Sequence, residues 1–235
     1  MSQARPASRR TAPAEVRAET ESPITWGRET WMTLLAAALV LLVAGGAGWL
    51  LDKAVEPQIP AALSNCATST QIGPRSFIGP QPMCITPSER LQATVTTTQG
   101  KFVILLHPEV APVTVNNFVV LAIHGYFNGM VFWRAEDWVV QTGDPGGDGH
   151  GGPGYNLPDE PGNTPWGLGA VGMARVHSGG VDAVNGSQFF IEKAAWPNSG
   201  PTAVYNRFGT VISGMSAVQA LSTTDTVTSV TIQVS

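Results

Sequence analysis

Polar and apolar residues alternate weakly over residues 91–98, LQATVTTT, and residues 101–106, KFVILL, are apolar after a Gln99-Gly100 turn. This pattern predicts two strands joined as a hairpin. Runs rich in β-branched and aromatic residues predict further strands. These lie at residues 131–142 (in two pieces), 187–192, 206–212 and 226–234.

Two helices are predicted among these strands. Residues 112–125 begin with a proline, carry apolar side chains on one side and end at a glycine, which suits a helix and its stop signal. Residues 214–221 place three apolar side chains at threefold spacing. Many strands with two helices predict a mainly β domain over residues 91–235, built as a closed barrel with capped ends.

The longest apolar run precedes this domain. Residues 31–51, WMTLLAAALVLLVAGGAGWLL, are 21 residues without a charge, and a helix of that length reaches about 30 Å, the hydrocarbon thickness of a bilayer. Trp31 and Trp49 lie near its ends, where aromatic rings anchor at the interface. The run predicts an uncleaved transmembrane helix. A buried core helix and a cleaved signal peptide, whose apolar region would span about 7–15 residues, are the weaker alternatives.

The basic residues near the run predict its orientation. Lys53 is the first basic residue after the run, and the next is Arg75. The positive-inside rule therefore predicts a cytoplasmic N-terminus and places the rest of the chain outside the cell membrane. Residues 1–30 have little apolar surface to bury, so they are predicted to be a disordered leader. The basic residues of this leader are Arg5, Arg9, Arg10, Arg17 and Arg28.

Residues 52–90 hold six prolines, which exclude a long helix and predict an extended stalk. The only two cysteines, Cys66 and Cys84, lie in this segment. In an oxidising compartment such a pair predicts a disulfide. Two free thiols are the alternative.

Composition and motifs exclude several functions. Charged residues make up 13% of the chain and the net charge is −4, so no basic surplus favours nucleic-acid binding. The pattern Gly147-x-Gly149-x-x-Gly152 matches a dinucleotide fingerprint, but no helix can follow it directly. The histidines are scattered without ligand spacing. We therefore expect neither a cofactor nor a metal. The four histidines are His107, His124, His150 and His177.

Five motifs in order resemble the cyclophilin family of peptidyl-prolyl isomerases, and the resemblance extends over residues 91–235. They are APVTVNNFVVLAIHGYFNGMVFWR, VVQTGDPGGDGHGGPGY, GLGAVGMAR, NGSQFFIE and NRFGTVISGM. The resemblance implies a closed antiparallel barrel of eight strands capped by two helices. It also implies an enzyme that rotates X-Pro bonds without a cofactor. Together with the apolar run at residues 31–51, it predicts a prokaryotic-like, membrane-anchored member of the family.

The resemblance also implies roles for particular residues. Arg134 corresponds to the arginine that acts on the prolyl amide, and Gln141 to the glutamine that supports it. The substrate-binding residues that it implies are Phe132, Trp138, Val139, Ala174, Arg175, Gln188, Phe190, Trp196 and Tyr205.

The sequence departs from the family pattern in several places. One residue is missing between Arg134 and Gln141, Trp133 replaces the usual histidine, and Tyr205 replaces another. Arg175 stands where the family has an asparagine, and about four residues are added between Arg175 and Asn185. The expected partners are proline-containing segments of exported or membrane proteins. The catalytic domain is expected to be monomeric. A binding module or holdase without catalysis, built on the same cleft, is the alternative function.

Overall fold

The structure is a computed structural model that describes residues 59–178, 180–197 and 204–234. The predicted leader and the apolar run at residues 31–51 lie outside the described residues. Within the described ranges, no helix combines the length and the apolar character needed to cross a membrane. The strands are β1 (Gln71–Gly73), β2 (Ser76–Phe77), β3 (Leu91–Thr97), β4 (Gly100–Leu106), β5 (Arg134–Ala135), β6 (Val139–Thr142), β7 (Asn156–Leu157), β8 (Ala170–Ser178), β9 (Val181–Glu192), β10 (Arg207–Ser213) and β11 (Val227–Val234).

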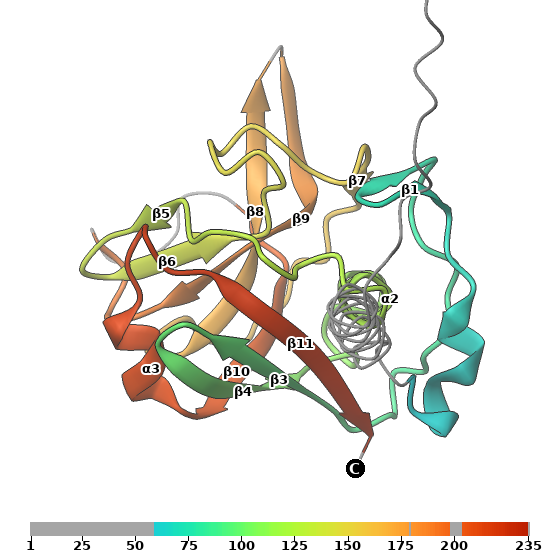
Figure 1. Ribbon diagram of the computed structural model, residues 1–235, viewed down its shortest axis with the longest axis horizontal. Coiled ribbons are helices and arrows are strands. Elements are labelled where there is room, and N and C mark those ends of the chain that lie inside the picture. The colour runs from blue at the N-terminus through green and yellow to red at the C-terminus, as the bar shows by residue number, and fades with distance from the viewer. Residues whose placement is uncertain (1–58, 179, 198–203, 235) are drawn as a thin grey trace, which may run out of the picture. The chain divides into compact units, whose positions relative to one another are not determined.

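One antiparallel sheet forms most of the domain. Its strands follow the order β11-β3-β4-β10-β8-β9-β6-β5, and β7 pairs with β9 beside this path. The sheet curls into a half-barrel, and β8 and β9 extend from it as a two-stranded arm (Figure 1). Burial alternates along β3, as expected for a strand with one face on the core.

The predicted closure of the barrel is wrong, because β11 and β5 stand at the two ends of the strand order. Among the described residues, the chain before β5 meets the start of β11 through one isolated bridge, Val131 with Thr226, and through backbone hydrogen bonds outside any regular ladder. The chain before β5 is irregular here, and Gly129 adopts a φ of 77°, a value that breaks a regular strand. A curled open sheet is therefore the better description.

Both predicted helices are present. Helix α2 (Pro112–Ile123) packs against β9 and β11, and its residues from Thr114 onward are buried. Helix α3 (Met215–Ala220) packs against β4 on another part of the sheet (Figure 1). Phe118 of α2 contacts three further phenylalanine rings, with centroids 5.1–5.5 Å away. These rings join the helix to the interior of the sheet.

Residues 59–90, here called the N-terminal belt, differ from the extended stalk that the prolines predicted. The belt forms the 3-10 helix η2 (Ala61–Ala67) and the β1–β2 hairpin. Proline limits long helices but does not prevent isolated apolar side chains from packing. The belt side chains that join the main core are Leu63, Cys66, Phe77 and Ile85.

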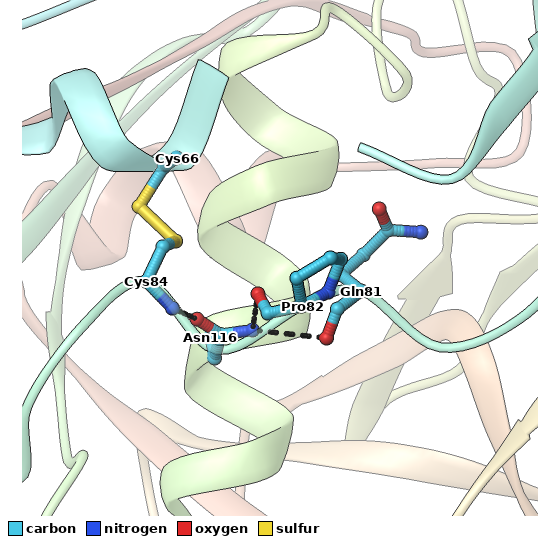
Figure 2. The surroundings of a disulfide bond; sticks show 5 residues. All are labelled: Cys66, Gln81, Pro82, Cys84 and Asn116. Carbon is cyan, nitrogen blue, oxygen red and sulfur yellow. Dashed lines mark hydrogen bonds between the residues drawn. A yellow bond between two sulfur atoms is a disulfide. The ribbon is translucent and has the colours of Figure 1, made fainter. Parts of the chain in front are cut away.

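The belt is fastened to α2 and to itself. Cys66 and Cys84 form a disulfide, and the buried Asn116 of α2 binds the chain beside it (Figure 2). The backbone N–H of Cys84 donates to Asn116 Oδ1 at 2.8 Å, and Asn116 Nδ2 donates to the carbonyl of Pro82 at 2.9 Å. Gln81 Nε2 also donates to the Tyr155 hydroxyl at 3.0 Å. The two hydrogen bonds of the Asn116 side chain explain why this polar residue occupies a buried helical position.

Candidate active site

One row of directly paired residues crosses the sheet and forms the base of the site. Arg134 of β5 pairs with Gln141 of β6, and Gln141 pairs with Phe190 of β9. Phe190 in turn pairs with Gly172 of β8. Directly opposed residues share a face of a sheet, so four adjacent strands place these positions on the same face.

A cleft of about 360 Å³ lies over this row. It brings together every predicted site residue except Phe132. The residues that line it are Trp133, Arg134, Trp138, Val139, Gln141, Gly149, Ala174, Arg175, His177, Gln188, Phe190, Trp196 and Tyr205.

Phe132 is the predicted pocket residue that lies elsewhere. Its side chain is fully buried and belongs to the main core of the domain. Its backbone N–H donates to the carbonyl of Asp225 at 3.1 Å, beside the start of β11. The assignment of Phe132 to the pocket wall is therefore not supported by the structure, since the side chain packs within the main core.

Three polar side chains form a hydrogen-bonded series at one end of the cleft. Arg134 Nη1 lies 3.5 Å from Gln141 Oε1, and Gln141 Nε2 donates to Gln188 Oε1 at 3.0 Å. Gln188 Nε2 donates to the carbonyls of Gly149 and Gly151. The two glutamines are buried, whereas the Arg134 side chain is 34% exposed. The series therefore orients Gln141 and leaves the guanidinium accessible.

Aromatic rings form the other end of the cleft. Phe190 is flanked by Tyr205 and Trp196, with centroid distances of 5.4 and 5.6 Å. The Trp138 and Trp196 rings lie 4.8 Å apart. Aromatic pairs at such distances stabilise one another and form an apolar wall.

Trp166 supports this wall, and the sequence analysis did not identify it. Its ring stacks on Phe190 at 5.6 Å with an interplanar angle of 19°. Gly172 makes room for that stack, because a Cβ there would lie 2.6 Å from Trp166 and 2.7 Å from Phe190. The glycine in GLGAVGMAR was a visible signal, but its partner ring is six residues away in sequence and cannot be deduced from spacing.

Arg175 lines the cleft, but its guanidinium is already occupied. It donates to Asp159 at 2.5 Å, to Asp182 at 2.7 Å and to the carbonyl of Val204 at 2.7 Å. Its side chain is only 6% exposed. The guanidinium therefore joins the β8–β9 arm to two other segments.

The glycine-rich segment beside the cleft is organised by Asp144. This buried carboxylate accepts hydrogen bonds from the backbone N–H groups of Gly146, Asp148 and Gly149. Burial alone would raise the pKa of Asp144, but these backbone donors outweigh it and lower the pKa. Gly149 reaches the cleft with a φ of 88°, and a Cβ there would lie 2.9 Å from Trp133.

Four further residues beside the cleft were not assigned roles from the sequence. Trp133, Gly149 and His177 line it, and Glu136 binds two of its lining residues. The missing residue between Arg134 and Gln141 was the only sequence signal for Glu136, since it drew attention to this turn.

The domain is thus a curled antiparallel sheet with few helices, and its cleft joins an arginine–glutamine pair to an aromatic pocket. Comparison with known sequences identifies its class. The family described as cyclophilin type peptidyl-prolyl cis-trans isomerase/CLD matches residues 92–234. This chain belongs to that family.

Individual relatives agree with this result. The peptidyl-prolyl cis-trans isomerase-like 1 of Aspergillus fumigatus is 41% identical over 131 residues, which cover 53% of this chain and 78% of that protein. Peptidyl-prolyl cis-trans isomerase B of Bacillus subtilis is 36% identical over 129 residues, covering 54% and 87%. A cyclophilin type isomerase of Cryptosporidium parvum shares the fold, with a TM-score of 0.54, 24% identity, and coverage of 62% of this chain and 98% of that chain.

Proposed function

We propose that this cleft accelerates cis-trans isomerisation of X-Pro bonds, as expected for a member of this family. The observation that carries the proposal is the row in which Arg134, Gln141 and Phe190 lie side by side. A similar Cryptosporidium parvum structure was determined in the presence of the dipeptide Ala-Pro. A ligand of that class combines an apolar ring with a neighbouring carbonyl. The aromatic side chains of this cleft can bind the ring, and the Arg134 guanidinium can donate to the amide.

The chemistry requires no nucleophile. The X-Pro bond resists rotation because the nitrogen lone pair is delocalised onto the carbonyl, with a barrier of roughly 18–20 kcal/mol. Donors placed to bind the twisted amide more tightly than the planar one lower that barrier. A reduction of about 7 kcal/mol would give about 10⁵ in rate.

In the proposed arrangement Arg134 donates to the prolyl amide from the accessible side of its guanidinium. Gln141 supports the arginine, because its own amide is fixed by Gln188. The proline ring packs against the apolar wall, so the ring stays in place while the carbonyl side of the X-Pro bond rotates. That wall consists of Trp138, Val139, Phe190, Trp196 and Tyr205. Ala174, Gln188 and the backbone of Arg175 then face the residues before the proline.

The test is cis-trans exchange of an Ala-Pro peptide, measured by NMR with the full chain in detergent micelles. Arg134→Ala should lower the catalysed exchange by about 10²–10³, the usual effect of removing a donor to the transition state. Lys101→Ala is the matched control, since it removes an exposed cation of β4 that does not line the cleft. Wild-type exchange no faster than buffer would refute the proposal. Peptide binding without acceleration would instead support the alternative, a non-catalytic binding module.

The proposal includes the location of the enzyme. Residues 31–51 would anchor it in the cell membrane with the N-terminus in the cytoplasm, and the isomerase domain would act on exported or membrane proteins as a monomer. The length of the apolar run and the arginines before it support this arrangement. Protease added to intact cells should digest the domain and spare the leader. Protection of the domain until the cells are lysed would refute this orientation.

A further inference from the structure

The turn between β5 and β6 carries a carboxylate with two partners in the cleft. Glu136 Oε1 accepts a hydrogen bond from Arg134 Nε at 2.6 Å, and Oε2 accepts one from Trp138 Nε1 at 2.7 Å. The backbone N–H of Glu136 donates to the carbonyl of Val139 at 2.8 Å, which closes the turn. One side chain thus binds both the arginine and the aromatic wall.

These bonds restrict the guanidinium of Arg134. Its Nε is held by Glu136, its Nη1 faces Gln141, and its central carbon lies 5.2 Å from the centroid of the Trp138 ring. Among the described residues, Nη2 makes no hydrogen bond. The donors that remain are therefore directed by the same contacts that hold the group, which is the arrangement that pre-organised catalysis needs.

The same carboxylate fixes the Trp138 ring. An indole has one polar atom, its N–H donor, and here Glu136 accepts it. The other side of the ring packs on Trp196 within the wall. The orientation of Trp138 is consequently set from both sides, and a change at Glu136 would be felt by the pocket as well as by Arg134.

The neighbouring Asp137 offers a comparison within the same turn. It is exposed like Glu136, but the structure gives its carboxylate no hydrogen bond or ion pair within the described part of the chain. A surface ion pair alone contributes little to stability. The role of Glu136 therefore depends on the two groups that it joins rather than on its charge at the surface.

We propose that Glu136 is a positioning residue for the isomerase reaction, and that its carboxylate holds the Arg134 guanidinium and the Trp138 ring in their productive geometry. This inference rests on the proposed function. It adds a residue outside the motif matches, in the turn where this chain is one residue shorter than the family pattern.

The first experiment compares Glu136→Gln and Glu136→Ala with Asp137→Asn, using the full chain in micelles and the Ala-Pro exchange assay. Both Glu136 variants should lower exchange at saturating peptide about tenfold, and the released Trp138 ring should raise the peptide Kd from chemical-shift titration by a smaller factor. Asp137→Asn, which removes the same charge, should stay within twofold of wild type. Glu136 variants that match Asp137→Asn would overturn the proposal, as would an equal loss in all three.

The second experiment follows the Trp138 indole N–H by NMR, with Trp138→Phe to assign its signal. The hydrogen bond from Arg134 holds the pKa of Glu136 below its ordinary value, assisted by the one from Trp138 and opposed by partial desolvation. The indole signal should therefore shift only when the pH falls below the usual range of a glutamate, and the exchange rate should fall in the same transition. Glu136→Gln should abolish the shift.

The two proposals fail in different ways. A wild-type chain without exchange activity would refute the proposed function and this role together. An active wild type that loses activity in Arg134→Ala, but whose indole signal does not titrate and whose Glu136 variants remain active, would refute the positioning role alone.

Discussion

The disulfide should contribute substantially to the stability of the domain. Cys66 and Cys84 are 18 residues apart, and on the chain-entropy model a closed loop of that size stabilises the folded state by about 3 kcal/mol at 25 °C. The side chains of Leu63 and Cys66 are fully buried in the main core, so the loop is part of the cooperative unit. For a protein of this size the effect corresponds to roughly 6–12 °C in Tm.

The prediction can be checked with Cys66→Ala/Cys84→Ala in the full chain. Urea unfolding followed by tryptophan fluorescence should give a free energy of unfolding about 3 kcal/mol below that of the oxidised wild type. Reduced wild type should match the variant, and the variant should not respond to reductant, which controls for other effects of the reagent. Equal unfolding free energies for oxidised and reduced wild type would show that the belt is held by packing and hydrogen bonds alone.

Two further predictions concern the charge and the packing of the domain. Hydrogen bonds from Thr98 and Ser222 lower the pKa of Asp225 from 3.8 to about 2. The stabilising effect of the Asp225 carboxylate is therefore complete above about pH 5 and lost as the pH falls toward 2. Asp225→Asn should flatten the pH dependence of the free energy of unfolding in that window. A curve parallel to that of wild type would contradict this. Gly172→Ala should lower the free energy of unfolding by about 1–3 kcal/mol and slow the catalysed cis-trans exchange of the peptide. The reason is that the alanine Cβ would lie 2.6 Å from Trp166. Unchanged urea unfolding and exchange would refute that account.

The sequence predicted regular elements better than irregular ones. Alternation in β3 and the start and stop residues of α2 are local signals, and both elements are present. The belt has no such periodicity, because Leu63, Phe77 and Ile85 are isolated among prolines and polar residues. Their burial depends on surfaces supplied by distant segments. For that reason the composition of the belt predicted a stalk, although its side chains complete the core.

In the candidate site, too, the sequence predicted less well what depends on contacts between distant strands. Ordered motifs led to Arg134, Gln141 and Phe190, but the side of the sheet that each residue faces depends on pairing. Phe132 shows the limit, since its place in the motif suggested a pocket wall and its side chain faces the core. Trp166 shows the converse. Its ring stacks on Phe190 beside Gly172, where a Cβ would meet both rings, and this arrangement depends on strand pairing that the sequence does not show.

The register of the strands beside the β5–β6 turn keeps the site residues in one row. A shift of one residue within a strand would move every side chain of that strand to the opposite face. In the structure Arg134 pairs with Gln141, and Ala135 with Val140, and the register of β6 against β9 places Gln141 opposite Phe190. The tight turn brings Glu136 between Arg134 and Trp138. One short turn thus supplies the carboxylate that fixes the side chains at both of its ends.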